Sequence, residues 1–309
     1  MQNIQYQNLK RYFTFNQFLR EQFGIKVQKI SLDAGFTCPN RDGKVGYGGC
    51  IYCHNPGFVA ATPHRSKKIR EQIEIAMISA KKRRFKGKFL AYFQAYSNTY
   101  APVDTLKRLY DEALEDDEIV GLSVGTRPDC VSEEVLSLLE RYALRYLVWI
   151  EYGLQSAHDK TLKLINRGHD FKCFRDAVKR TRDRGIYICA HVILGLPGED
   201  EEKMYETIRI LSDLKIDGIK LHHLQVVKQT VLEDRYRNGG IRVFSRDEYI
   251  SLVCNIIERL PSGMVIHRLM GDVRPGLLVA PDWKMPKTEI IARVDKELER
   301  RNTYQGIFL

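Results

Sequence analysis

Short apolar runs alternate with amphipathic stretches along most of this chain. We expect the apolar runs to form strands at residues 27–34, 89–95, 119–124, 146–152, 187–194 and 218–226. We expect the amphipathic stretches to form helices at residues 65–84, 103–115, 132–142, 171–184 and 201–214. Strands and helices that alternate at about 30-residue spacing predict a parallel sheet with right-handed crossovers.

Six such units predict the α/β class and a partial (β/α)6 barrel, with helices outside and the site at the carboxyl ends of the strands. A doubly wound open sheet is the alternative, but no Gly-rich phosphate fingerprint follows the first strand. We expect a helical extension at residues 1–25 and the barrel at 26–230. A capping region at 231–309 would hold helices at 246–260 and 287–301 and a strand at 264–269.

Polar residues follow five of the six predicted strands or lie near the carboxyl ends of these strands. They are Gln94–Thr99, Gly125–Asp129, Glu151–Ser156, Gly195–Glu199 and, on the sixth strand, Lys220, His222, His223 and Gln225. One such end would be only a turn signal, and Thr126–Asp129 could equally cap a helix. Together with the loop after the first strand, these ends predict one shared pocket at a single pole of the barrel.

The loop after the first strand contains three cysteines, Cys38, Cys50 and Cys53, and no fourth cysteine nearby. Three thiolates suit an iron–sulfur cluster that leaves one iron open. A structural zinc site is the main rival and would need a fourth ligand, such as His54 or His64. The glycines of the loop let its backbone turn sharply around a bulky group.

Composition says little about the fold but indicates the cellular compartment in which we expect the protein. The 309 residues are 44% hydrophobic and 28% charged, as in ordinary globular proteins, and no apolar run approaches the roughly 20 residues that span a bilayer. Without a secretory h-region at the start, we expect a cytoplasmic protein with no membrane partner. Seven cysteines, an odd number, then favour reduced thiols over disulfides.

Charge favours an anionic partner such as nucleic acid, because 49 basic residues outnumber 39 acidic ones and the net charge is +10. The densest basic run holds the expected RNA-binding residues Lys81, Lys82, Arg83 and Arg84. The alternative is a solvated helix end whose cations complement the helix dipole.

Several of these motifs, taken together, resemble those of the radical S-adenosylmethionine (SAM) enzymes, specifically the bacterial YtqA/YhcC family. They are the cysteine loop, Thr126–Asp129, Gly153–Ser156, Ile165–His169 and Gly195–Glu199. The long gap between Cys38 and Cys50 matches the stretched motif of elongator-like relatives. The resemblance covers roughly residues 10 to 285 and is specific only when the motifs are taken jointly.

The resemblance implies a 4Fe–4S cluster on Cys38, Cys50 and Cys53, with SAM bound at the open iron. Reductive cleavage of SAM would then give a deoxyadenosyl radical, with an electron donor such as flavodoxin or ferredoxin. By position it implies SAM contacts from Tyr96, Ser97, Gln155, Arg167 and His191. Arg167 would clamp a carboxylate with two parallel hydrogen bonds.

Elongator-like enzymes act on the wobble uridine of transfer RNA, and the chain is too short for elongator's acetyltransferase domain as well. The resemblance therefore implies a neighbouring step, the trimming of carboxymethylaminomethyl-uridine to aminomethyl-uridine. Lys220, His222 or His223 could hold the substrate carboxylate, but adjacent histidines on a strand point to opposite faces. The alternatives are a radical SAM enzyme acting on a small metabolite or a peptide, and a zinc-stapled RNA-binding module without enzyme activity.

Overall fold

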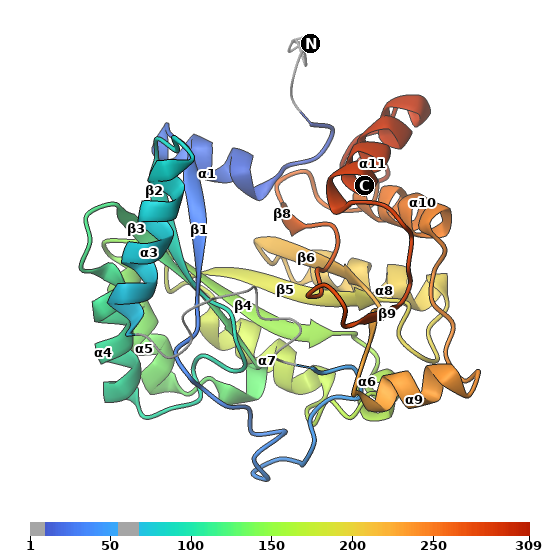
Figure 1. The fold of residues 1–309 in the computed structure, drawn as a ribbon, viewed down its shortest axis with the longest axis horizontal. Helices are drawn as coiled ribbons and strands as arrows, with labels where there is room; N and C mark the ends of the chain where they lie inside the picture. Colours follow the sequence, from blue (N-terminus) through green and yellow to red (C-terminus); the bar gives the residue numbers. More distant parts are fainter. Residues whose placement is uncertain (1–9, 55–67) are drawn as a thin grey trace.

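Seven parallel strands form one curved, open sheet in the computed structural model, which describes residues 10–54 and 68–309. Their order, β1-β2-β3-β4-β5-β6-β8, follows the chain (Figure 1). The bounds are β1 Val27–Leu32, β2 Lys88–Phe93, β3 Ile119–Thr126, β4 Leu147–Gln155, β5 Tyr187–Leu194, β6 Gly218–His223 and β8 Val265–Arg268. The prediction of a parallel α/β partial barrel is confirmed.

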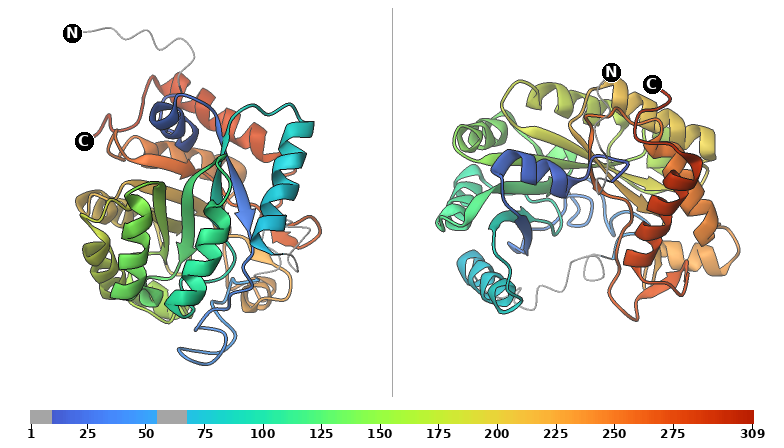
Figure 2. Two further views of the ribbon diagram at one scale, coloured as in Figure 1. Left: turned by 90° about the vertical axis from the view of Figure 1, so that its left-hand side faces the viewer. Right: turned by 90° about the horizontal axis from the view of Figure 1, so that it is seen from above.

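Helices cover the outer, convex face of the sheet (Figure 2). Those expected from the sequence are α3 Ile69–Lys82, α4 Val103–Leu114, α5 Glu133–Ala143, α7 Phe171–Thr181, α8 Glu201–Asp213, α10 Arg246–Ile257 and α11 Lys287–Arg301. The first residues of the helix predicted at 65–84 lie outside the described part of the chain. Several helices are preceded by an N-cap residue whose side chain accepts a backbone N–H of the first turn, such as Ser132, Asp170 and Asp200.

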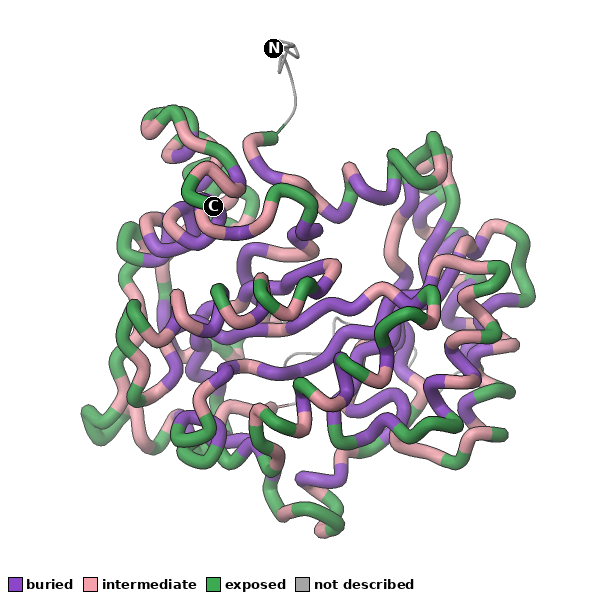
Figure 3. Tube along the Cα trace, turned by 180° about the vertical axis from the view of Figure 1, so that it is seen from behind, coloured by how far each residue is buried: buried purple, intermediate pink, exposed green. Residues whose placement is uncertain are grey.

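Side chains alternate across the sheet, and this alternation separates the core from the barrel interior. On β4, Val148, Ile150 and Tyr152 pack outward into the main hydrophobic core beneath the helices. Trp149 and Glu151 point to the interior, and both side chains are fully buried. Figure 3 shows the buried strands between helices whose outer faces are exposed.

The strand predicted at 264–269 as part of a cap belongs to the sheet instead. Its counterpart β8 pairs in parallel with β6, so a boundary at residue 230 would cut through the sheet. The predicted sixth strand is also shorter than expected. It ends at His223, and β7 Val226–Val227 pairs with β9 Leu278–Ala280 in a separate antiparallel ribbon.

Helix α1, Phe15–Phe23, closes the amino-terminal mouth of the barrel. The backbone N–H of Ile266 in β8 donates to Phe13 O over 2.8 Å. The rings of Phe15 and Phe18 pack edge-on against Trp149, with centroids 5.7 and 5.3 Å away. Because this end is plugged, only the carboxyl ends of the strands can open to a ligand.

Three further elements were not predicted: α6 Asp159–Leu164, α9 Val231–Arg237 and the short 3-10 helix η1 Pro128–Cys130. None of the helices in the described ranges is long and apolar enough to cross a bilayer.

Candidate active site at the carboxyl ends of the strands

A cavity of about 230 Å³ opens at the carboxyl ends of the strands. All of the predicted cluster, cofactor and substrate residues line it. They are Cys38, Cys50, Cys53, Tyr96, Ser97, Gln155, Arg167, His191, Lys220, His222 and His223. The structure thus brings together residues that span more than half of the chain, although the role of each one stays a prediction.

The cysteine loop is tied to the segment Ile165–Arg167, which follows α6. Ile51 N donates to Ile165 O over 3.0 Å, and Asn166 Nδ2 donates to Gly49 O over 2.8 Å. Backbone hydrogen bonds also turn the loop on itself, since Cys53 N donates to Cys50 O over 2.9 Å. Two regions that the sequence separates by more than 100 residues therefore form one structural unit.

The close approach of the Asn40 side chain explains why two positions of this unit are glycines. Its Nδ2 donates to Asn166 O over 2.7 Å and lies 3.8 Å from Cys50 Sγ. A Cβ at Gly46 or at Gly168 would lie only 2.7 Å from Asn40 Oδ1. Gly46 is therefore required for close packing, whereas Gly48, with a φ of 77°, is required for a turn.

The guanidinium group of Arg167 has different partners from the carboxylate that we expected. Its Nε donates to Gly153 O over 3.2 Å, Nη2 donates to the same oxygen, and Nη1 lies 3.6 Å from Cys50 Sγ. Burial lowers the pKa of Arg167, but the side chains of Cys50 and Tyr52 outweigh this effect and raise the pKa above its usual value. Gly153 leaves room for this guanidinium, because a Cβ there would lie 2.7 Å from Nη2.

Arg127, from the Thr126–Asp129 motif, supports Arg167 from behind. Its Nη1 donates to Arg167 O over 2.8 Å, and its Nε and Nη2 donate to the two carboxylate oxygens of Asp129 over 2.8 and 2.7 Å. The motif therefore positions the residue that touches Cys50, and it does not cap a long helix.

The donor set of the loop fits a cluster better than a single ion. Burial, and then the neighbouring Cys50, raise the pKa of the Cys53 thiol to about 12, so bound iron is needed to hold it as a thiolate. In residues 10–54 and 68–309, no three His, Cys, Asp or Glu side chains are grouped to hold one metal ion. A 4Fe–4S cluster binds each thiolate through a different iron, which suits more widely spaced thiols. His54 Nε2 lies 3.4 Å from Gln229 Oε1, and His64 lies outside the described residues.

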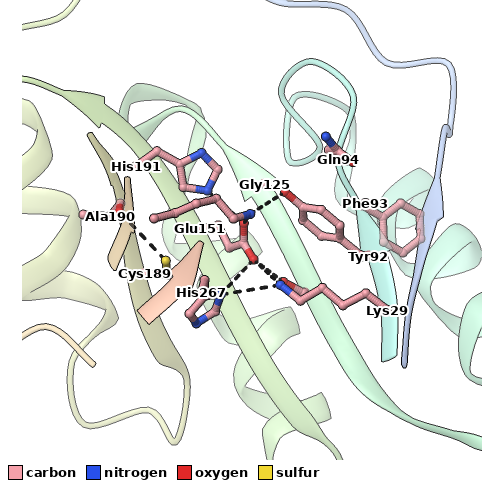
Figure 4. A network of polar contacts seen from close by, with 12 residues as sticks. Lys29, Tyr92, Phe93, Gln94, Gly125, Glu151, Cys189, Ala190, His191 and His267 are labelled. Atoms are coloured by element: carbon pink, nitrogen blue, oxygen red, sulfur yellow. Dashed lines mark hydrogen bonds and ion pairs between the residues drawn. The ribbon is translucent and has the colours of Figure 1, made fainter. Parts of the chain in front are cut away.

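Below the cysteine loop, the buried carboxylate of Glu151 occupies the centre of the barrel (Figure 4). Its Oε1 accepts from Lys29 Nζ over 2.9 Å and from Ser123 Oγ over 2.7 Å, with His267 Nδ1 3.4 Å away. Its Oε2 accepts from Lys220 Nζ and lies 2.8 Å from His191 Nε2. Although burial favours the neutral acid, Lys220 and Lys29 hold the pKa of Glu151 well below its usual range.

The three substrate candidates on β6 divide between the two faces of the sheet. Lys220 and His222 point into the barrel, and Lys220 also donates to Tyr92 OH over 2.8 Å. Burial lowers the pKa of Lys220 to about 8, against the attraction of Glu151. His223 borders the cavity, but its ring stacks on Trp283, with centroids 4.6 Å apart, and is 4% exposed. His223 is therefore the least suited of the three to hold a substrate.

Two cavity residues have backbone conformations that non-glycine residues rarely adopt. Tyr96 has a φ of 64° and Gln155 a φ of 80°. Gln155 also coincides with a shift in the register between β4 and β5. Strain of this kind concentrates at functional sites, and both residues belong to the predicted SAM-binding set.

The basic run Lys81–Arg84 lies at the opposite pole of the barrel. It ends α3, and the chain then enters β2 beside the start of β1, where Lys88 N donates to Lys26 O over 2.9 Å. Lys81 pairs with Glu118 over 3.1 Å, and both side chains are exposed. A role of these cations in RNA binding stays a prediction, and any such contact would be remote from the cavity.

Comparisons with known proteins agree with this geometry. A sequence profile described as the Radical SAM superfamily matches residues 38–211, and one described as the Radical_SAM C-terminal domain matches residues 216–300. The chain belongs to the radical SAM superfamily. Enzymes of this superfamily use a 4Fe–4S cluster and SAM, so the predictions of both cofactors and of enzyme activity are confirmed.

The chain has relatives of more than 40% identity in bacteria. It is 42% identical to YtqA of Bacillus subtilis, over 97% of this chain and 93% of that protein. It is 41% identical to YhcC of Escherichia coli K12, over 87% of this chain and 86% of that protein. The archaeal Elp3 of Methanocaldococcus infernus has the same fold, with a TM-score of 0.68 at 18% identity. That match covers 90% of this chain and 64% of the archaeal one.

The site contains functional candidates that the sequence analysis missed. Lys29, Glu151 and His267 form the centre of the barrel, and Arg268 lines the cavity. The one available signal was a charged residue at an inward position of an otherwise apolar strand, as for Glu151 in Leu147–Gln155. From the sequence, Glu151 is only the first residue of the polar stretch at the end of the fourth strand.

Replacing Cys50 with alanine is expected to abolish cluster loading, because two thiolates cannot replace three ligands. The measurement is iron and sulfide content with visible absorbance after anaerobic reconstitution. Cys173→Ala, which removes a thiol that does not line the cavity, is the matched control and should load normally. Full iron content in the Cys50→Ala protein would refute the ligand assignment.

Replacing Arg167 with methionine should make the cluster harder to reduce. A hydrogen bond to a ligating sulfur stabilises the more negative, reduced cluster, so its loss shifts the reduction potential downward. An EPR-monitored redox titration of the loaded protein measures this shift. Arg293→Met, on the exposed face of α11, should leave the potential unchanged. An unaltered potential in Arg167→Met would show that the contact with Cys50 does not affect the cluster.

Replacing Glu151 with glutamine should lower the free energy of unfolding by about 3–5 kcal/mol, because it leaves buried cations unpaired. Glu74, in an exposed pair with Arg70, gives the control, and Glu74→Gln should cost no more than about 0.5 kcal/mol. Urea unfolding of the three proteins measures both changes. Equal losses in the two variants would remove Glu151 as the central constraint.

Proposed function

We propose that this radical SAM enzyme modifies the wobble uridine of transfer RNA by trimming carboxymethylaminomethyl-uridine to aminomethyl-uridine. The observation that carries the proposal is the charge of the cavity. Five basic residues line it, Arg41, Arg127, Arg167, Lys220 and Arg268, against the two acidic residues Glu151 and Asp272. Such a cavity favours an anionic substrate group, and the carboxymethyl group of this nucleoside is one.

Similarity to transfer RNA enzymes gives independent support. The chain is 27% identical to the tRNA uridine(34) acetyltransferase of Methanocaldococcus infernus over 52% of its length, which corresponds to 30% of that protein. The net charge of +10 also suits a polyanionic partner.

The reaction needs few groups from the protein. Cys38, Cys50 and Cys53 would hold the cluster, and Tyr96, Ser97, Gln155 and His191 would hold SAM, beside the Arg167 that contacts Cys50. When bound, these cofactors supply the one-electron chemistry that removes a hydrogen atom from an unreactive C–H bond. The remaining tasks of the chain are to orient the substrate methylene, to neutralise its carboxylate and to control access of water.

The proposed reaction oxidises the carboxymethylamino group by two electrons. Loss of a hydrogen atom from the methylene between amine and carboxylate leaves a radical that both groups stabilise. Loss of one electron to the oxidised form of an electron-carrier protein, such as flavodoxin or ferredoxin, and of the amine proton gives an imine. Water hydrolyses the imine to the aminomethyl group and glyoxylate. The carrier recovers the electron that it gave to start the reaction.

Nucleoside mass spectrometry of transfer RNA from cells with and without the protein tests the proposal. Cells that lack it should accumulate carboxymethylaminomethyl-uridine and lose the aminomethyl form and its products. Re-expression of the wild-type chain should restore the profile, whereas a Cys50→Ala chain should not. An unchanged wobble-uridine profile would refute transfer RNA as the substrate and favour a small metabolite or a peptide.

A further inference from the structure

Arg268 differs from every other arginine that lines the cavity. It ends β8, and its guanidinium group has no hydrogen bond or ion pair within the described residues. By contrast, Arg127 is held by Asp129, Arg167 by Gly153 O, and Arg41 donates to Cys53 O over 3.3 Å. The guanidinium of Arg268 is half-buried in the cavity wall, and its N–H donors, which no described residue engages, are free to bind a ligand.

The acidic groups near Arg268 already have partners. Both carboxylate oxygens of Glu151 are engaged by Lys29, Lys220 and their neighbours. Asp272 forms an ion pair with Lys287 over 2.5 Å. Lys29 and Lys220 therefore share the buried carboxylate of Glu151, and neither acidic residue of the cavity is ion-paired with Arg268 among the described residues. The positive charge of Arg268 also adds to burial in lowering the pKa of His222, so this ring is neutral.

A small recess of polar groups adjoins Arg268 on the β6 side. The Nε2 atom of His222 is buried and has no hydrogen-bond partner in the described chain. Gln225 is 8% exposed and lines the same cavity. A Cβ at Gly271 would lie 2.8 Å from Gln225 Oε1 and 2.9 Å from His222 Nδ1. The glycine therefore keeps this recess open.

We propose that Arg268 binds the carboxylate of the substrate, with His222 and Gln225 beside it. A guanidinium group matches a planar carboxylate through two parallel hydrogen bonds. Lys220, which we expected to serve here, is held by Glu151 and Tyr92, so it contributes charge rather than the direct contact. The identity of the substrate rests on the proposed function, but the carboxylate site itself does not.

The first test compares Arg268→Gln with the wild type on a transfer RNA that carries carboxymethylaminomethyl-uridine. Loss of a charge-assisted pair should raise KM about 10- to 100-fold, while the Kd for SAM, measured by equilibrium dialysis, stays within about twofold. Arg268→Lys, which keeps the charge but loses the two-point contact, should lie between the two. Arg293→Gln removes an exposed arginine and should behave as the wild type.

Gly271→Ala gives a second variant, because it narrows the recess and leaves every charge in place. Its KM for the same transfer RNA should also rise. An unchanged KM in Arg268→Gln overturns the proposal. If the Arg268→Gln variant keeps its KM for the transfer RNA but has a higher Kd for SAM, the proposal is also overturned, because Arg268 would then bind the carboxylate of SAM.

A probe of the site that does not involve RNA separates this proposal from the proposed function. Sarcosine reproduces the carboxymethylamino group, and sarcosinamide is its amide, which lacks the negative charge of the carboxylate. Saturation-transfer NMR should detect sarcosine, but not sarcosinamide, on the loaded wild type, and neither ligand on Arg268→Gln. If the wild type leaves the transfer RNA unmodified yet shows this pattern, the proposed function fails and the carboxylate site survives. Equal sarcosine signals from wild type and variant refute the site.

Discussion

The carboxylate of Glu151, buried at the centre of the barrel, constrains the rest of the structure. A buried charge costs several kcal/mol unless oppositely charged and hydrogen-bonding groups surround it. Every strand of the seven-stranded sheet supplies a group to the polar network around Glu151, directly or through Lys220. The groups are Lys29 from β1, Tyr92 from β2, Ser123 from β3, Glu151 from β4, His191 from β5, Lys220 from β6 and His267 from β8. A shift of β2, β3, β5 or β6 by one residue would replace its polar group with an apolar one, so this polar network fixes the register of these four strands.

The polar network around Glu151 also separates two regions of the barrel that have different functions. Beneath it, the rings of Phe15, Phe18 and Trp149 fill the amino-terminal mouth, and Lys29 Nζ lies 4.2 Å from the centroid of Phe15. Above it lies the cavity with the cysteine loop. Because Lys29 donates to Glu151, and Lys220 donates to Glu151 and Tyr92, the lysines at the floor of the cavity are held in place. Arg268, which has no ion pair within the described ranges of the chain, lies at the edge of this network.

The sequence predicted the order of the strands because each strand and helix carries its own local periodicity. It predicted the shared cavity because the ends of parallel strands meet at one pole. It could not predict that β8 extends the sheet, because a four-residue strand has little periodicity and its pairing with β6 depends on tertiary packing. Glu151 was hard to interpret for the same reason. One charged residue within an apolar strand has no meaning until its partners, which lie up to 122 residues away, are known.

Arg167 shows that a sequence motif, too, does not reveal the contacts of its residues. The resemblance of Ile165–His169 to a motif of the family indicated a functional segment, and Arg167 of this segment does line the cavity. Its partners, however, are Cys50 and Gly153, because Ile165 and Asn166 bind the cysteine loop through its backbone and leave the next side chain beneath it. A motif can identify the important arginine, but only the fold decides whether that arginine meets the substrate, the cofactor or the ligand of the cluster.

The electrostatics of the cavity suit chemistry in which stray proton transfers would be harmful. Burial lowers the pKa of His191 to about 4 and that of Lys220 to about 8. Between these two values the histidine stays neutral, Lys220 stays charged, and Glu151 stays ionised because the lysines hold its pKa low. The floor of the cavity therefore presents a constant charge through the neutral range. As the pH rises through about 8, Lys220 loses its proton and the attraction of the cavity for an anion weakens. The buried carboxylate that fixes the fold thus also fixes the charge that a substrate meets.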